Sequence, residues 1–313
     1  MIPMILVGGL GGGGDSGGSL SVAIALKQLG LDVSILGVLN CHKHNIVNAK
    51  VVAGSLLEIN PASWSSGRFF EPHIASLGWR VYSICIRDGL NEALEGLEKI
   101  IDDLNVKAFI GVDFGGDIIV KGDEPDVGST TNDSMALALL VEAKRKLGLK
   151  SLLGIGVLGG EFGGCIPMPL LVENVLEIVK SGGYLGAYKP KEEVRRKFLG
   201  TAGYLLSRVP SLMLTIYTDA LKNRLGRNFY SVAYFRGKFE VRKYHKYIFF
   251  FNPDDACKVN RFCQVALRKR SFRKVRDAVK SRERSRRKGL SNWEKILDKL
   301  IKKPWRPESL MNT

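Results

Sequence analysis

Continuous apolar runs and helically spaced apolar residues alternate along the first half of the chain. The continuous runs predict buried strands at residues 1–7, 31–39, 79–86, 106–113 and 151–158. The helically spaced residues predict helices at residues 19–30, 90–104 and 129–147. Strands that alternate with helices predict a Rossmann-like α/β fold, with a mostly parallel sheet and helices on both faces.

The pattern changes after residue 160. Helical spacing recurs at residues 169–180, 191–207, 210–225 and 291–301. Two alternating runs, 229–235 and 238–251, predict a C-terminal β-hairpin that turns at Arg236-Gly237. We therefore predict a Rossmann-like domain over residues 1–265, which includes these helices and the hairpin, and a basic helical extension over residues 266–313. The irregular stretch 40–78 is long enough to be a functional loop or lid.

Composition indicates where the protein is located and in which redox state its cysteines are. No apolar run in the 313 residues reaches the roughly 18 that a membrane span needs, so we expect a cytoplasmic protein without membrane contact. The five cysteines are odd in number and scattered, which predicts reduced thiols rather than a disulfide framework. They are Cys41, Cys85, Cys165, Cys257 and Cys263.

The first strand runs into a glycine-rich segment, Gly8 to Gly18, that ends where the first helix is predicted. Backbone N–H groups at the start of a helix favour a phosphate or carboxylate ligand. The alternative is a flexible surface turn, but so many glycines in one loop are better explained by close approach to a ligand. The residues expected to bind this ligand are Gly11, Gly12, Gly13, Gly14, Asp15 and Ser16, together with Asn40 and Ser129 at two other predicted element ends.

Two known versions of such a loop fit the sequence poorly. A Walker loop ends in Gly-Lys-Ser/Thr, whereas this loop has Asp15-Ser16 and no lysine. A dinucleotide fingerprint matches formally at Gly9, Gly11 and Gly14, but Asn40 stands where a ribose-binding acid is expected. An NAD(P) site would then have to use Lys43 for a 2′-phosphate.

Acidic residues follow two further predicted strands. Asp113, Asp117 and Asp133 are placed to converge on one spot, although Asp133 also suits the first turn of a helix as a dipole partner. Glu161 follows the next strand, among glycines. Hard oxygen ligands beside a phosphate-binding loop predict Mg²⁺ held by Asp113, Asp117 and Glu124. Alternatively, Asp113, Asp117 and Glu161 act as general acids or bases.

The formal net charge of +16 is concentrated near the C-terminus. The segment from Arg268 to Lys288 contains twelve Lys and Arg residues but only two acidic residues, Asp277 and Glu283. This run predicts either a solvated helix face or a contact with RNA phosphates. Only one aromatic residue, Phe272, lies inside the run to stack on bases.

The chain resembles the family called domain of unknown function 1152, which is archaeal and bacterial. The matching segments are GGLGGGGDSGGSLSVAIAL near the start, GRFFEP at 67–72, GVDFGGDIIVKGDEP at 111–125 and GGEF around Glu161. The resemblance implies a nucleotide-binding-like α/β fold, with motif positions at residues 11–15, Asp113, Asp117, Glu124 and Glu161. The chain departs from the family pattern at the start of the helix predicted from residue 129. There it has Ser129-Thr130-Thr131-Asn132-Asp133 in place of the Ser-Pro-Leu-x-Asp that we associate with the family.

These observations predict an enzyme that binds a phosphate-bearing small molecule, a nucleotide or sugar phosphate, together with Mg²⁺. The same pocket also suits a nucleotide- or NAD(P)-binding module without catalysis. A third alternative is an RNA-associated protein that uses residues 268–288.

Overall fold

The computed structural model describes residues 4–67, 69–285 and 287–310. Within these ranges, one large sheet has the strand order β3-β4-β5-β2-β1-β6-β7-β11-β8, and a hairpin pairs β9 with β10. The strands are β1 (Met4–Gly9), β2 (Asp32–Leu39), β3 (Lys50–Ala53), β4 (Leu56–Ile59), β5 (Val81–Cys85), β6 (Val106–Phe114), β7 (Lys150–Gly156), β8 (Tyr184–Tyr188), β9 (Gly226–Val232), β10 (Phe235–Val241) and β11 (Ile248–Phe251).

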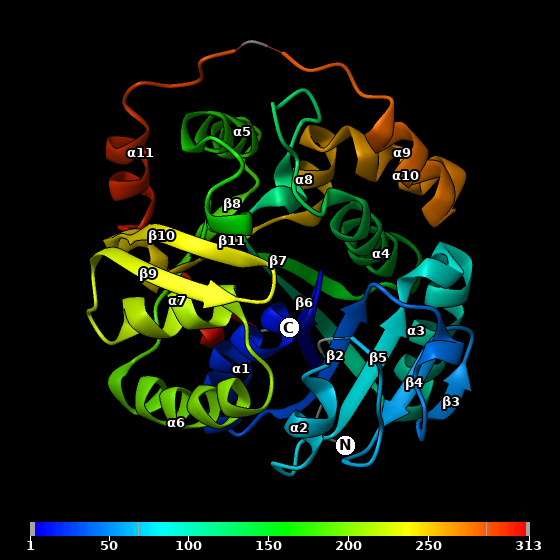
Figure 1. The fold of residues 1–313 in the computed structure, drawn as a ribbon. Helices are drawn as coiled ribbons and strands as arrows, with labels where there is room; N and C mark the ends of the chain where they lie inside the picture. Colours follow the sequence, from blue (N-terminus) through cyan, green and yellow to red (C-terminus); the bar gives the residue numbers. More distant parts are fainter. Residues whose placement is uncertain (1–3, 68, 286, 311–313) are drawn as a thin grey trace.

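Helices cover both faces of this sheet, as Figure 1 shows for α1, α6 and α7 on one side and α4, α8 and α9 on the other. Alternate residues of β1 point to opposite faces, so Leu6 belongs to one apolar core and Val7 to the other. The helices are α1 (Gly13–Gln28), α2 (Glu71–Ala75), α3 (Leu90–Leu104), α4 (Thr130–Leu147), α5 (Met168–Lys180), α6 (Glu192–Arg208), α7 (Leu212–Leu221), α8 (Pro253–Val259), α9 (Arg261–Lys269), α10 (Phe272–Lys280) and α11 (Trp293–Leu300).

The order of the strands creates a switch point between β1 and β6. From β1 the chain moves outward through β2 to β5 and then returns to pair β6 with the other side of β1. All of these pairings are parallel, as is that of β6 with β7. Ligands of open α/β sheets bind beyond the carboxyl ends of the strands at such a point. The fold class expected from the sequence is thus confirmed, and it places the loops after β1 and β6 side by side.

The first helix begins earlier than the apolar pattern predicts. It starts at Gly13, not Ser19, so half of the glycine-rich segment is helical. The glycines are needed for packing: a Cβ at Gly14 would lie 2.6 Å from the Ser211 hydroxyl, and one at Gly18 would overlap the Phe114 ring. Tertiary contact therefore overrides the low helix propensity of glycine here.

The predicted hairpin is wrong in its turn and its second strand. The turn lies between Val232 and Phe235, whereas Gly237 is extended and paired with Tyr230 inside the hairpin. The Phe235 ring covers Gly237, which compensates for the missing side chain. Residues 248–251 leave the hairpin and join the main sheet as β11, antiparallel to both β7 and β8.

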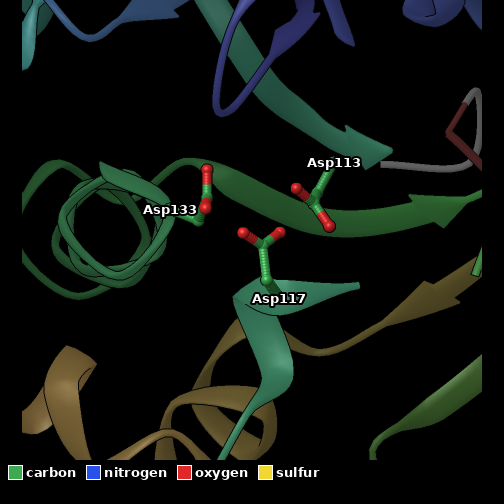
Figure 2. Close-up of side chains that lie close together, drawn as sticks. All are labelled: Asp113, Asp117 and Asp133. Atoms are coloured by element: carbon green, nitrogen blue, oxygen red, sulfur yellow. The ribbon is translucent and has the colours of Figure 1, made fainter. Parts of the chain in front are cut away.

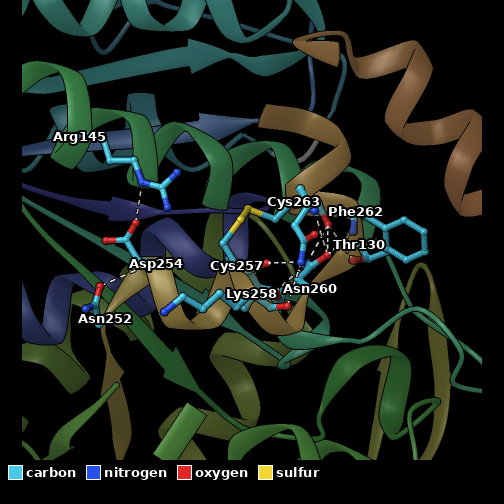
Figure 3. Close-up of a disulfide and its surroundings, with 12 residues drawn as sticks. Thr130, Arg145, Asn252, Asp254, Cys257, Lys258, Asn260, Phe262 and Cys263 are labelled. Carbon is cyan, nitrogen blue, oxygen red and sulfur yellow. Dashed lines mark hydrogen bonds and ion pairs between the residues drawn. A yellow bond between two sulfur atoms is a disulfide. The ribbon is translucent and has the colours of Figure 1, made fainter. Parts of the chain in front are cut away.

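Two disulfides contradict the expectation of reduced thiols. Cys41 and Cys85 follow or end neighbouring parallel strands, which brings their Cα atoms within 4.8 Å of each other. Cys257 and Cys263 join α8 to α9, with Cα atoms 5.5 Å apart (Figure 3). The pairing of Cys41 with Cys85 could not be predicted from the sequence, because only the order of the strands makes the two residues neighbours. Cys165 is free.

The C-terminal helices pack onto the α/β core. Val275 of α10 is fully buried, and α10 contacts both α4 and α9. Two residues of the basic run form internal ion pairs: Arg270 with Glu142 at 2.9 Å, and Arg287 with Asp123 at 2.7 Å. A domain boundary at residue 265 stays a prediction, and it falls inside α9.

Within the described ranges, no helix combines the length and apolar character needed to cross a membrane.

Replacing glycine by alanine should have opposite effects on stability at two helical positions, one packed in α1 and one exposed in α6. Gly18→Ala should lower the free energy of unfolding by about 1–3 kcal/mol, because the added methyl group meets the Phe114 ring. Gly200→Ala in α6 should raise it by roughly 0.5–1 kcal/mol, because its position is exposed and open. Urea unfolding of both variants checks this, and equal effects at the two positions would contradict the packing role.

Candidate functional site

A cavity of about 310 Å³ lies at the switch point, where the ends of β1, β2 and β6 meet the start of α1. Small-molecule sites begin at about this size. Its described lining includes glycines, carboxylates and aromatic rings: Gly11, Gly12, Gly13, Gly14, Asp15, Leu39, Asn40, Cys41, Ile46, Ser65, Gly67, Phe69, Phe70, Asp113, Phe114, Asp117, Ser129, Asp133, Glu161, Phe162, Ser211, Met213 and Tyr234. Arg68, within the GRFFEP segment, lies outside the described residues.

Most of the residues expected from the sequence meet at this cavity. The cavity is lined by Gly11, Gly12, Gly13, Gly14, Asp15, Asn40, Asp113, Asp117, Ser129, Asp133 and Glu161, whereas Ser16 and Glu124 do not line it. Ser16 belongs to the first turn of α1, and its hydroxyl donates to Glu71 at 2.6 Å. Glu124 is fully buried elsewhere and accepts N–H groups from Lys121 and Gly122. Its carboxylate thereby closes a turn.

Five acidic side chains form what we call the carboxylate cluster: Asp15, Asp113, Asp117, Asp133 and Glu161. Within it, single oxygens of Asp113, Asp117 and Asp133 all lie within 4.8 Å of one another. Figure 2 shows these three carboxylates pointing toward a common centre from β6, from the turn after it and from α4. This separation allows one cation to contact all three.

Asparagine side chains hold the elements that carry the cluster. Asn260 caps α9 by accepting the N–H of Phe262 at 2.8 Å, and it donates to the Ile118 carbonyl at 2.8 Å. This second bond fixes the turn that begins at Asp117. Asn132 in α4 donates to the Gly11 carbonyl at 2.9 Å, which ties the helix bearing Asp133 to the glycine-rich segment.

Several glycines make room for the carboxylates themselves. A Cβ at Gly115 would lie 2.5 Å from a Glu161 oxygen, and one at Gly128 would lie 2.7 Å from an Asp117 oxygen. A Cβ at Gly11 would collide with the Asp133 carboxylate. The glycine-rich loops therefore let acidic side chains approach the backbone.

Protein donors do not saturate the cluster. The Ser129 hydroxyl lies 2.9 Å from Asp117, 3.2 Å from Asp133 and 3.4 Å from Glu161, but it has only one proton to donate. Asp113 accepts the Gly116 N–H at 2.9 Å. Among the described residues that line the cavity, none carries a positive charge. The remaining oxygens are left for protons or a cation.

Burial and mutual repulsion both oppose ionisation of the cluster. Burial raises the pKa of Asp113, and the nearby carboxylates of Asp117 and Asp15 raise it further. Burial likewise raises the pKa of Asp133 and of Glu161, with Asp117 as the largest added cause in each case. The pKa of Asp15 is raised by the same two effects, although the N–H groups of Gly12 and Phe114 partly offset them.

Glu71, from the GRFFEP segment, supports the site from behind. It is fully buried, and one of its oxygens has no hydrogen-bond partner among the described residues. Burial raises the pKa of Glu71 to about 7. A Cβ at Gly37 would lie 2.6 Å from its other oxygen, so β2 also needs a glycine at this position.

The loop after β7 is strained where it enters the cavity. Val157 and Phe162 have φ angles of +47° and +42°, in the left-handed region that non-glycine residues rarely adopt. Such residues cost about 1–3 kcal/mol each and concentrate at functional sites. Sequence reasoning missed Phe162 as a site residue, although it directly follows Glu161, and it missed the more distant Met213 and Tyr234.

Comparison with known families identifies the chain. The family described as "Protein of unknown function (DUF1152)" matches residues 6–284, and the chain belongs to this family. No curated protein and no solved structure matches it at a significant level.

The raised pKa values predict that the protein without metal loses stability as the pH rises. Between pH 5 and 7.5 the native carboxyls retain protons that the unfolded chain has released, so the free energy of unfolding falls with pH. The carboxyls alone should lower it by about 1.4 kcal/mol for each unit by which a native pKa exceeds its unfolded value. Burial lowers the pKa of His245 to about 3, and this group acts in the opposite direction between pH 5 and 6.5.

Urea unfolding in EDTA across this pH range measures the effect. Glu71→Gln should make the dependence shallower, because it removes one buried carboxyl. Glu98→Gln, at an exposed position of α3, should leave it unchanged. A pH dependence that is the same in Glu71→Gln and in the unmodified protein would show that burial does not raise the pKa of Glu71.

Proposed function

We propose that this member of the DUF1152 family is a divalent-cation-dependent enzyme that acts on a phosphate-bearing small molecule. The observation that carries the proposal is the carboxylate cluster, which lines part of a cavity whose described lining has no cationic side chain. Burial and mutual repulsion both oppose charge on these carboxylates, so their close grouping is best explained by a cation that neutralises them. Mg²⁺ suits the all-oxygen donors and keeps waters that a substrate phosphate can replace.

Asp113, Asp117 and Asp133 are the residues assigned to the cation. Their oxygens lie within 4.8 Å of one another, and all three side chains are buried. Asp133 thus replaces Glu124, which was expected to be a ligand but has its oxygens occupied by N–H donors. The bound cation would polarise a phosphate oxygen or lower the pKa of a bound water.

The start of α1 is assigned to the phosphate. Gly13 and Gly14 open this helix and line the cavity, and N–H groups in a first helical turn have no acceptor within the helix. Asp15 occupies part of this anion site itself, because its carboxylate accepts the Gly12 N–H at 2.9 Å. Without a cation, the carboxylates would repel an anion from these N–H groups, so phosphate binding should require the metal.

Glu161 is assigned to proton transfer. It lies at the cavity, 3.4 Å from the Ser129 hydroxyl, and burial raises its pKa. A carboxyl with a raised pKa exchanges protons closer to neutral pH than an ordinary glutamate. The non-catalytic alternative, a nucleotide- or NAD(P)-binding module, needs no such group. Lys43, which a 2′-phosphate would require, instead donates to the Gly54 carbonyl at 2.8 Å.

Mg²⁺ should stabilise the protein through the assigned aspartates. At 100 times the dissociation constant, binding raises the free energy of unfolding by about 2.7 kcal/mol, because only the folded state holds the site. Asp117→Asn should abolish this response, and Asp298→Asn on the exposed face of α11 should retain it. Thermal and urea unfolding with and without MgCl₂ measure both, and a full response in Asp117→Asn would overturn the assignment.

Glu161→Gln separates catalysis from binding. Because the amide cannot transfer a proton, the variant should still bind pyrophosphate in the presence of Mg²⁺ but release phosphate from its substrates at least about 100-fold more slowly. Calorimetry and phosphate release from a panel of nucleotides and sugar phosphates measure the two properties. Unchanged turnover would remove Glu161 from the mechanism, and an absence of turnover in the unmodified protein would favour the non-catalytic alternative.

A further inference from the structure

Aromatic side chains line the cavity together with the carboxylates. Phe162 and Tyr234 lie edge to face, with ring centroids 6.2 Å apart and ring planes at 89°. Phe69 and Phe70 add two more rings to the lining. The cavity therefore offers a ligand both a strongly acidic surface and flat apolar surfaces, which calls for a ligand with two chemically different parts.

Phe162 is held at the cavity at a conformational cost. The residue is 42% exposed, unusual for a large apolar ring, and its φ angle of +42° is rare for any residue with a Cβ. The neighbouring Gly163 lets the Phe235 ring of the hairpin pack directly against the loop. The hairpin thus supports the strained loop, and burial of the Phe162 ring does not explain the strain.

Tyr234 reaches the cavity from the hairpin turn. Its hydroxyl accepts the N–H of Leu212 at 2.9 Å, at the start of α7. This bond anchors the tip of the hairpin beside Met213, another lining residue. Tyr234 and Met213 are thereby brought together at one border of the cavity.

We infer that Phe162 and Tyr234 bind the base of a nucleotide whose phosphates lie at the cation. The inference rests on the proposed function and names its ligand class. Aromatic side chains stack on every nucleobase because every base has a π-face, which a sugar ring lacks. Asn40, at the end of β2, lies where Rossmann-type folds contact the ribose, and it also lines the cavity.

Calorimetry with Mg²⁺ separates the contribution of the nucleoside from that of the phosphates. ATP, GTP, CTP and UTP are titrated against tripolyphosphate, which has the phosphates alone, and adenosine, guanosine, cytidine and uridine supply the base without phosphates. At least one nucleotide should bind about 10-fold more tightly than tripolyphosphate. Phe162→Ala should remove that advantage and leave tripolyphosphate binding unchanged.

Two variants control the experiment. Phe229→Ala removes another ring of the same hairpin, 58% exposed and absent from the described lining, and should change neither affinity. Tyr234→Leu tests the second ring without altering the strained loop, and it decides the matter if thermal unfolding shows that Phe162→Ala does not fold. It too should lower nucleotide affinity selectively.

The outcomes separate the two proposals. Equal affinity for nucleotides and tripolyphosphate, or an equal loss of both in Phe162→Ala and Tyr234→Leu, overturns the base site and leaves the proposed function intact. Nucleoside binding that depends on Phe162, without any Mg²⁺-dependent phosphate binding, supports the base site and overturns the proposed function. If nucleotides and nucleosides fail to bind but tripolyphosphate binds with Mg²⁺, only the base site is wrong. If tripolyphosphate does not bind either, both proposals are wrong.

Discussion

Repulsion among buried carboxylates is the constraint on which the architecture of this site depends. Asp113 is brought to Asp15 because β6 pairs directly with β1, and Asp133 arrives on the first turn of α4. Both α1 and α4 direct their amino termini at the cluster, where the helix dipole partly offsets negative charge. Asn260 and Asn132 then lock the turn after β6 and the glycine-rich segment in place. Grouping carboxylates in this way lowers the free energy of unfolding, which is typical of functional sites.

The sequence predicted the central part of the fold well because its signals there are local. The strands β1, β2, β6 and β7 are continuous apolar runs, and their observed bounds differ from the predicted ones by a few residues, with residues 1–3 outside the described part. The start of α1 at Gly13 could not be seen, since it depends on how closely Phe114 and Ser211 pack on its glycines. The placement of β11 between β7 and β8 depends likewise on pairings with distant strands.

The candidate site was predictable only where its residues directly follow strands. Asp113 and Glu161 could be placed at one sheet edge by topology alone. Glu124 carries the same chemistry in the sequence, but its carboxylate closes a turn, and only three-dimensional contacts reveal this. Tyr234 comes from a hairpin whose turn was placed elsewhere, so no pattern connected it to the cavity.

The central claim is that the three aspartates Asp113, Asp117 and Asp133 hold a divalent cation. Anomalous diffraction from crystals of the protein grown with MnCl₂ tests it most directly, because Mn²⁺ accepts the same oxygen ligands as Mg²⁺ and identifies its own position. The account predicts an anomalous peak within coordination distance of all three carboxylates. Manganese bound only at other sites, or a cluster without any peak at saturating metal, would contradict it.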